Sequence, residues 1–593
     1  MEKAKGVVWN LAELYAGADD ANLIKDIGEV VGRAEGFKQT YRGKIASPES
    51  TANLLAQALQ KYEELLEKSY RPYAMANLLF TADGRSDQHK ALVAKVQDTV
   101  TRMNNEILFF TLEIQAIENG RMKDFCSADV LAPYRHYLES LRLFTPYMLS
   151  ETEEQVVNRK NLTGKTALVN LFDEFTAAFE WNLEIDGQKK TLTQSEVREL
   201  QRNQDAGVRR MAKKAHDSKF GENSLIFTNI FGNIIKDHAN ELEARGYTNP
   251  MQPTHLDNKA PADVVDMMMD VTTENNPLVQ RYCRLKAKML QLPKLTGSDL
   301  YAPVAKSDRT VPFEEGKKLV LDSFGHFLPE FGDIVGRAFE EHWLDAEVRP
   351  GKRGGAFCYS VAPSVHPFVL MNYVDNLDSV YTMAHEFGHA LHTVLASETQ
   401  SILTFHPPLI LAETASVFAE MLLTRRLLAD NPDRETRIQI LASKLEDFIG
   451  TISRQTMYTR FELDAHLEGA RRRLSADDFC SLWLDRREEL YGDSVAFLPE
   501  ERWFWSVIPH FIHTRFYCYA YTFGALFVLA LFNQFQREGD AFKPKYRALL
   551  AAGDSDWPEN QIKRVGLDFH DKSFWQGGFK VVQTMLDELE SLV

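Results

Sequence analysis

The sequence predicts a mainly α-helical protein with little β-structure. Apolar residues recur every three or four positions over long stretches, as they do on one face of a helix; one such stripe is Leu92, Val96, Val100, Met103, Ile107 and Phe110. Strand signals are few, and no fixed-period repeat supports a helical solenoid. The 593 residues are enough to bury a large core.

The N-terminal part is expected to be helical and to end in a β-hairpin. Leu55, Leu59, Tyr62 and Leu66 show the same helical spacing. The hairpin is predicted over residues 181–192, where Asp186-Gly187 can supply the positive φ angles of a tight turn. We therefore place a boundary near residue 195, between a helical N-terminal domain (1–195) and a larger domain (196–593).

An irregular region over residues 344–376 interrupts the helical pattern of the larger domain. It contains Gly351-Lys-Arg-Gly-Gly355 and an extended-looking stretch over 366–373. We expect one small β-sheet here, beside the helix that contains the motif described below.

The charge balance and the cysteines limit the class of protein. Lys and Arg number 68 against 84 Asp and Glu, and the net charge of −16 argues against a nucleic-acid or anionic-membrane binder. Five scattered cysteines favour a reducing compartment over a disulfide framework. The uncharged stretch 516–532 is shorter than the ~20 residues that span a bilayer, so we expect a buried helix. With no apolar segment of signal-peptide length near Met1, a cytoplasmic location is predicted.

The motif His385-Glu386-Phe-Gly-His389 indicates a metal site on a helix, for which Asp378 is the predicted N-cap. Residues four apart lie about 40° from each other around a helix, so both imidazoles point to one place. They suit two corners of a zinc tetrahedron. Glu386 is positioned to act as general base on a water molecule there.

The third ligand is predicted to be Glu413. The metzincin pattern requires Gly and His where this chain has His392 and Leu395, so that class is excluded. A Glu from a following helix is the other common solution, and residues 409–420 have helical apolar spacing. A carboxylate on such an apolar helix is costly to bury unless it is paired or metal-bound. The predicted cofactor is one zinc ion, held by His385, His389 and Glu413.

Glu420 and His392 are two further polar side chains near the predicted ligands. Glu420 lies seven residues after Glu413 and shares its helix face; it either orients a zinc-bound histidine or forms an ordinary ion pair. His392 is interpreted as a wall residue rather than a ligand, because two His and one Glu already leave the open position that catalysis requires.

A later segment combines two histidines and three tyrosines: His510, His513, Tyr517, Tyr519 and Tyr521. Peptide hydrolysis builds negative charge on the carbonyl oxygen, which a Tyr O–H or a His N–H can stabilise. Aromatic residues at this density are also typical of a packed core. We expect at least one catalytic donor among the five.

These features together resemble the oligoendopeptidase F branch of the thimet-oligopeptidase-like zinc metallopeptidases. The matching segments span almost the whole chain: Trp9 to Tyr15, Gly351 to Cys358, His385 to Ala390, Glu413 to Ser416, and His510 to Tyr519. The resemblance implies a helical ellipsoid with a deep substrate channel and zinc at its floor, which admits short unstructured peptides and excludes folded proteins.

The resemblance also implies roles for individual residues. Gly354, Gly355 and Ala356 would form a sheet edge that pairs with the substrate backbone, since glycines permit close approach. His510 and Tyr519 would bind the carbonyl oxygen, with His513 as a rival to His510. Tyr517 and Tyr521 would line the site.

The leading hypothesis is a zinc endopeptidase for short oligopeptides, without nucleic-acid or membrane partners. The alternative is a zinc carboxypeptidase, which would need a basic group such as Arg353 or Arg515 near the metal. A peptide-binding scaffold without catalysis is the third, and Glu386 argues against it because a binding module needs no general base. The sequence makes no prediction of oligomeric state.

Overall fold

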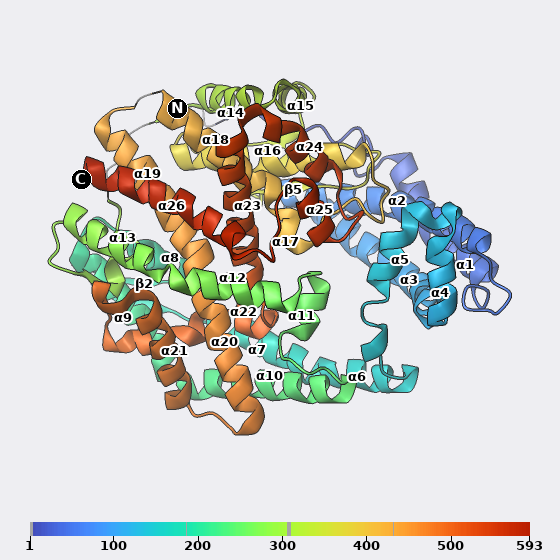
Figure 1. The fold of residues 1–593 in the computed structure, drawn as a ribbon, viewed down its shortest axis with the longest axis horizontal. Coiled ribbons are helices and arrows are strands. Elements are labelled where there is room, and N and C mark those ends of the chain that lie inside the picture. The colour runs from blue at the N-terminus through green and yellow to red at the C-terminus, as the bar shows by residue number, and fades with distance from the viewer. Residues whose placement is uncertain (1–3, 186, 305–309, 431) are drawn as a thin grey trace. The chain divides into compact units, whose positions relative to one another are not determined.

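The computed structural model describes residues 4–185, 187–304, 310–430 and 432–593 (Figure 1). It is 71% helix and 4% strand, which confirms the predicted mainly α-helical class. The described strands form a hairpin, a parallel pair and one three-stranded sheet, all of them short. The fold is therefore built by helix packing, and the sheets are local additions.

The chain forms two compact units, each assembled from three stretches of sequence. The first unit comprises Met1–Pro146, Asp308–Asn431 and Gln534–Asp568; the second comprises Tyr147–Ser307, Pro432–Asn533 and Phe569–Val593. The predicted division into 1–195 and 196–593 is linear, whereas these units interleave along the chain. The domain boundary near residue 195 therefore stays a prediction.

The first unit contains a bundle of α1, α2 and α3, whose helices pack side by side (blue in Figure 1), and a layer of helices around α16. Its helices are α1 (Ala21–Tyr41), α2 (Ala52–Ala82), α3 (Asp87–Ala116), α4 (Asn119–Ser127), α5 (Arg135–Leu141), α14 (Phe313–Phe327), α15 (Pro329–Glu340), α16 (Leu377–Ser397), α17 (Leu409–Ala412), α18 (Thr414–Ala429), α24 (Lys543–Ala551) and α25 (Pro558–Arg564). The predicted apolar stripe lies on α3, where Val96, Met103, Ile107 and Phe110 are buried.

The three-stranded sheet of the first unit lies beside α16, as predicted. Its order is β4 (Leu344–Asp345), β6 (Phe368–Leu370) and β5 (Phe357–Tyr359). The central strand β6 is completely buried; it runs parallel to β4 and antiparallel to β5. Strand β5 is thus an edge strand, next to the helix that contains the metal-site motif.

The second unit contains the remaining helices and strands. They are α6 (Glu151–Thr163), α7 (Lys165–Ala177), β1 (Trp181–Ile185), β2 (Gln188–Leu192), α8 (Gln194–Leu200), α9 (Ala206–Glu222), α10 (Ser224–Arg245), α11 (Gln252–Asp257), α12 (Ala262–Glu274), α13 (Asn276–Met289), β3 (Leu295–Thr296), α19 (Arg434–Phe448), α20 (Arg454–Arg471), α21 (Ala476–Tyr491), β7 (Val495–Ala496), α22 (His510–His513) and α26 (Lys572–Leu592). Its core is rich in aromatic side chains from α9, α10, α20 and α21.

The predicted hairpin is confirmed. Strands β1 and β2 pair antiparallel, with Trp181 opposite Leu192. Gly187 has a φ of +74°, as the predicted turn requires, while Asp186 lies outside the described residues.

The long apolar segment near the C-terminus contains α23 (Cys518–Glu538), which runs from the second unit into the first. The stretch Cys518–Ala551 is long and apolar enough to cross a membrane, but 83% of its most apolar window is buried inside the protein. It is a core helix, as expected from the length of the uncharged stretch 516–532. The cytoplasmic location stays a prediction.

Candidate metal centre

Helix α16 holds His385, Glu386 and His389 in the first unit. The helix begins after Asn376, whose side chain accepts a hydrogen bond from the N–H of Ser379 at 2.9 Å. The prediction of Asp378 as the N-cap was wrong by two positions. Asp378 lies in the first helical turn, where its carboxylate interacts favourably with the positive end of the helix dipole. Asn376 instead has the extended backbone that an N-cap requires.

A glycine allows α16 to lie directly against α18. A Cβ on Gly388 would lie only 2.5 Å from the Cα of Ser416 and 2.6 Å from the carbonyl oxygen of Ala415. Any larger residue would push the two helices apart. Glu413 directly precedes α18, so this close approach brings its carboxylate to the two histidines.

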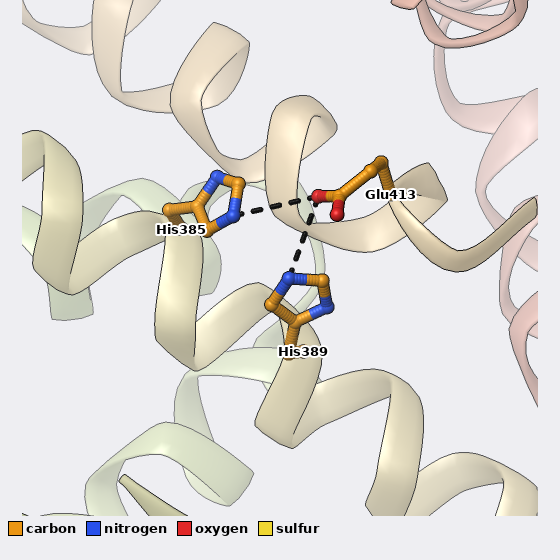
Figure 2. A group of neighbouring side chains, drawn as sticks. All are labelled: His385, His389 and Glu413. Atoms are coloured by element: carbon orange, nitrogen blue, oxygen red, sulfur yellow. Dashed lines mark ion pairs between the residues drawn. The ribbon is translucent and has the colours of Figure 1, made fainter. Parts of the chain in front are cut away.

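The three predicted ligands converge in the structure (Figure 2). The same oxygen of Glu413, Oε2, lies 3.4 Å from Nε2 of His385 and 3.4 Å from Nε2 of His389. Ligand atoms of a tetrahedral zinc ion, at Zn–N distances of ~2.0–2.1 Å, lie ~3.3–3.4 Å apart. The spacing therefore fits a zinc ion, and two imidazoles with one carboxylate are a donor set that zinc prefers.

Glu413 does not lie within a continuous helix over 409–420, as the apolar pattern suggested. It occupies the break between α17 and α18, at the N-cap position of α18. The prediction that a distant Glu joins the two histidines is nevertheless consistent with the geometry, since the three ligand atoms lie within 4.8 Å of one another.

Glu420 contacts the first histidine on the side away from Glu413. Its Oε1 lies 2.7 Å from Nδ1 of His385, which leaves Nε2 of the ring directed at Glu413. A carboxylate on the far ring nitrogen fixes the tautomer and orientation of a metal-binding histidine. This contact favours the orienting role over the ordinary surface pair.

Ser416, which no sequence pattern assigned to the site, contacts Glu413. Its hydroxyl donates to Oε2 of Glu413 at 2.5 Å and also contacts the Glu413 backbone carbonyl at 3.1 Å. Ser416 therefore fixes the rotamer of Glu413. In the sequence, only the spacing of three residues between Glu413 and Ser416, at the start of a predicted helix, indicated this contact.

The charges around the histidines favour a cation at this place. Burial alone would lower the pKa of His385, but the hydrogen bond to Glu420 and the nearby charges of Glu413 and Glu386 raise it to about 9. Burial would raise the pKa of Glu413, but His389 and His385 lower it to about 2. The same carboxylates that favour a proton at this place would also favour a metal cation.

Glu386 lines a cavity of about 390 Å³ together with His385 and His389. The residue is only 6% exposed, and burial raises the pKa of its carboxyl above the ordinary value. His392 also lines this cavity and is 6% exposed, with a pKa that burial lowers to about 3. It is absent from the ligand group found among the described residues, in agreement with its interpretation as a wall residue.

The predicted substrate-pairing segment precedes the edge strand β5. Gly354 and Gly355 are exposed, and Gly355 has a φ of +81° that favours glycine. Ala356 lines the same cavity as Glu386. The three residues thus stand at a sheet edge next to the candidate site, while their role in binding stays a prediction.

The five histidines and tyrosines of the second unit have different surroundings. His510, Tyr517 and Tyr521 form one half-buried group: the rings of His510 and Tyr517 stack at 5.6 Å, and Nε2 of His510 lies 3.3 Å from the hydroxyl of Tyr521. His513 is exposed, and its Nε2 lies 2.7 Å from Asp173.

Tyr519, in contrast, is completely buried. Its hydroxyl donates to the backbone carbonyl of Thr254 at 3.1 Å and accepts from the side-chain amide of Asn258 at 2.8 Å. These contacts favour Tyr521 over Tyr519, and His510 over His513, as donors to a substrate. The catalytic roles themselves stay predictions.

Comparisons with known proteins show the family of this chain. The model of peptidase family M3 matches residues 199–581, and a model described as oligopeptidase F matches residues 113–181. The chain belongs to peptidase family M3. It is therefore a peptidase, and the resemblance stated from the sequence is confirmed.

Relatives and solved structures match over nearly the full chain. The oligopeptidase PepF of Bacillus subtilis is 28% identical over 93% of this chain and 82% of its own length. An oligoendopeptidase F homolog of Lactococcus lactis is 25% identical over 100% and 98% of the two chains. The oligoendopeptidase F structure from Enterococcus faecium has a TM-score of 0.70 at 24% identity, covering 96% of this chain and 98% of its own. The structure of a putative peptidase from Chlamydophila abortus has a TM-score of 0.90 at 23% identity, covering 99% of this chain and 98% of its own. These two structures share the fold.

Proposed function

We propose that the protein is a zinc-dependent endopeptidase that hydrolyses internal bonds of short, unstructured oligopeptides. The observation that supports this most directly is the convergence of both histidines on one oxygen of Glu413, at distances that suit a zinc tetrahedron. The full-length relatives named oligopeptidase and oligoendopeptidase support the substrate class.

His385, His389 and Glu413 would hold one zinc ion. When bound, zinc supplies a Lewis acid that polarises the scissile carbonyl and lowers the pKa of water toward 7. Glu420 and Ser416 keep His385 and Glu413 in the orientation that this binding needs.

Glu386 would be the general base. It neighbours the first ligand on α16 and lines the cavity, and burial raises the pKa of its carboxyl, which brings it closer to the working pH of a base. In the proposed reaction, Glu386 takes a proton from the attacking water. It then passes that proton to the leaving amine nitrogen, so that the carboxylate is regenerated.

The proposal also includes hydrogen-bond donors for the carbonyl oxygen. His510 with Tyr521, or Tyr519 as the family pattern implies, would stabilise the negative charge on the carbonyl oxygen. Tyr517 would line the site beside His510, against which its ring stacks. His513 would have a supporting role in binding, as its ion pair with Asp173 competes for the ring. Gly354, Gly355 and Ala356 would pair with the substrate backbone.

A carboxypeptidase would need a cation that binds the terminal carboxylate of the substrate. None of the described residues that line the cavity beside Glu386 is a lysine or an arginine. Arg353 is not among them, although it lies over the ring of Phe357, which does line the cavity, at 5.7 Å from its centroid. The cavity lining thus favours the endopeptidase, and Arg353 stays the candidate cation of the alternative.

The experiment is cleavage of a short quenched-fluorescent peptide with both termini blocked, beside intact casein, with and without a zinc chelator. We expect chelator-sensitive cleavage of the peptide and none of casein. A blocked peptide that stays intact while a free-ended one is trimmed from its C-terminus would establish the carboxypeptidase. Cleavage that the chelator does not reduce would contradict the zinc site.

A further inference from the structure

The segment that joins α22 to α23 turns sharply at Phe516. This residue has a φ of +55°, in the left-handed region that a bulky residue rarely adopts. Its side chain is completely buried, although nearby Thr514 is exposed and Arg515 and Tyr517 are half-buried. A backbone conformation of this kind persists only where the surroundings fix it.

The carboxyl of Glu462, on α20, contacts the backbone of this turn, which is also held by the hydrogen bonds from the Tyr517 N–H to the Thr514 carbonyl and from the Thr254 hydroxyl to the Arg515 carbonyl. The N–H of Phe516 donates to Oε1 of Glu462 at 2.9 Å, and both residues are 0% exposed. Glu462 has no ion pair within the described part of the chain, and its second oxygen has no hydrogen-bond partner there. Burying a carboxyl group with a single hydrogen bond and no ion pair costs free energy. We therefore expect Glu462 to be buried here for the sake of its contact with the Phe516 N–H.

His466 supports the turn from the same face of α20, one helical turn after Glu462. Its ring packs on the ring of Phe516 with centroids 4.8 Å apart, and it is 2% exposed. Burial and the nearby His238 lower its pKa well below the ordinary value, so it stays neutral. Burial also raises the pKa of Glu462 to about 8, although Phe516 and Arg515 act in the opposite direction. A mostly protonated acid at neutral pH resembles a glutamine in shape and charge.

The turn at Phe516 stands between the two halves of the donor group. His510 precedes it on α22, Tyr517 follows it directly, and Tyr521 lies in the first turn of α23. The stacking of His510 on Tyr517 and its 3.3 Å contact with Tyr521 both depend on the direction in which the chain leaves this turn. A small rotation at Phe516 would therefore separate the histidine from both tyrosines.

We propose that Glu462 is a positioning residue, whose hydrogen bond to the Phe516 N–H holds His510 against Tyr517 and Tyr521 and so pre-organises the donors for the substrate carbonyl. The inference rests on the proposed function, in which these side chains bind that oxygen. Glu462 touches no substrate in this scheme; it acts through the backbone of the turn.

The test compares Glu462→Ala with Glu462→Gln, using cleavage of the blocked peptide. Glu462→Ala removes the acceptor, and we expect kcat to fall about ten- to hundredfold, with zinc content unchanged and KM altered much less. Glu462→Gln keeps a carbonyl oxygen at the same place, so we expect kcat near that of the wild type. Glu468→Ala is the matched control, because it removes a more exposed carboxylate from the same helix.

A second variant and a second readout keep the test decisive. If Glu462→Ala does not fold, Glu462→Asp withdraws the acceptor by one methylene and should show the same loss of kcat. Hydrogen exchange at the Phe516 amide should become faster in both variants but not in Glu462→Gln. The positioning role would be overturned if Glu462→Ala and Glu462→Asp kept the wild-type kcat, or if Glu462→Gln lost as much kcat as Glu462→Ala. Either result would leave the proposed function intact. A wild-type enzyme that leaves the blocked peptide uncut would instead overturn the proposed function, and this inference with it.

Discussion

Removal of the Glu420 carboxylate should weaken zinc binding without unfolding the protein. The contact of 2.7 Å between Oε1 of Glu420 and Nδ1 of His385 is a short, charge-assisted hydrogen bond, and both side chains are mostly buried, at 20% and 29% exposed. A hydrogen bond to a charged group contributes about 1.5–3 kcal/mol. Since 1.4 kcal/mol corresponds to a tenfold change in an equilibrium constant, Glu420→Ala should weaken zinc binding by about 10- to 100-fold.

The assay is competition for zinc between the protein and a chromophoric chelator, which gives the dissociation constant directly. Glu420→Gln keeps an acceptor but loses the charge, so it should lie between Glu420→Ala and the wild type. Glu314→Ala is the control, because it removes an exposed carboxylate on α14 of the same unit. If Glu420→Ala binds zinc within twofold of the wild type, the orienting role of Glu420 is refuted.

Two other predictions concern packing and titration. Gly388→Ala places a Cβ 2.5 Å from the Cα of Ser416, so overpacking should lower the free energy of unfolding by about 1–3 kcal/mol and weaken zinc binding as well; unchanged denaturant unfolding would contradict the close approach of α16 and α18. The raised pKa of Glu462, about 8, means that the folded protein holds a proton there that the unfolded chain releases above its ordinary pKa. This contribution to stability is fully present below that ordinary pKa and is lost as the pH rises through about 8, with a slope of at most about 1.4 kcal/mol per pH unit. Unfolding of Glu462→Gln measured across pH 5 to 8 should lack this slope relative to the wild type, and identical pH profiles would argue against the raised pKa.

Local periodicity was sufficient to predict what depends on one helix or one hairpin. The pair His385 and His389 is fixed by the geometry of a single helix, and the β1–β2 hairpin by its turn residues. Glu413 is distant in sequence and was predicted from the cost of burying a carboxylate among apolar residues. The structure does place it beside the two histidines, but in the break between α17 and α18 and with its side chain 42% exposed, so that argument was not the physical reason. The N-cap of α16 was missed because Asn376 and Asp378 both carry side chains that can cap a helix, and only the backbone angles separate them.

Contacts between residues far apart in the chain could not be predicted from the sequence. Tyr519 and Tyr521 look equivalent in the chain, yet the hydroxyl of Tyr519 is bonded to Thr254 and Asn258, more than 260 residues earlier. Likewise, no periodicity shows that the N–H of Phe516 meets Glu462. Such pairings depend on how helices of the second unit pack, and they decide which of several similar side chains stay available for a substrate.

The most direct test of the central claim is Glu386→Gln, measured for zinc content and for turnover of the blocked peptide in the same preparation. The substitution keeps the size of the side chain and leaves His385, His389 and Glu413 in place, but it removes the group that accepts the proton. We predict one zinc ion per chain, as in the wild type, with kcat lower by at least about 100-fold. Near-wild-type turnover with zinc bound would contradict the account, because water would then be activated without Glu386.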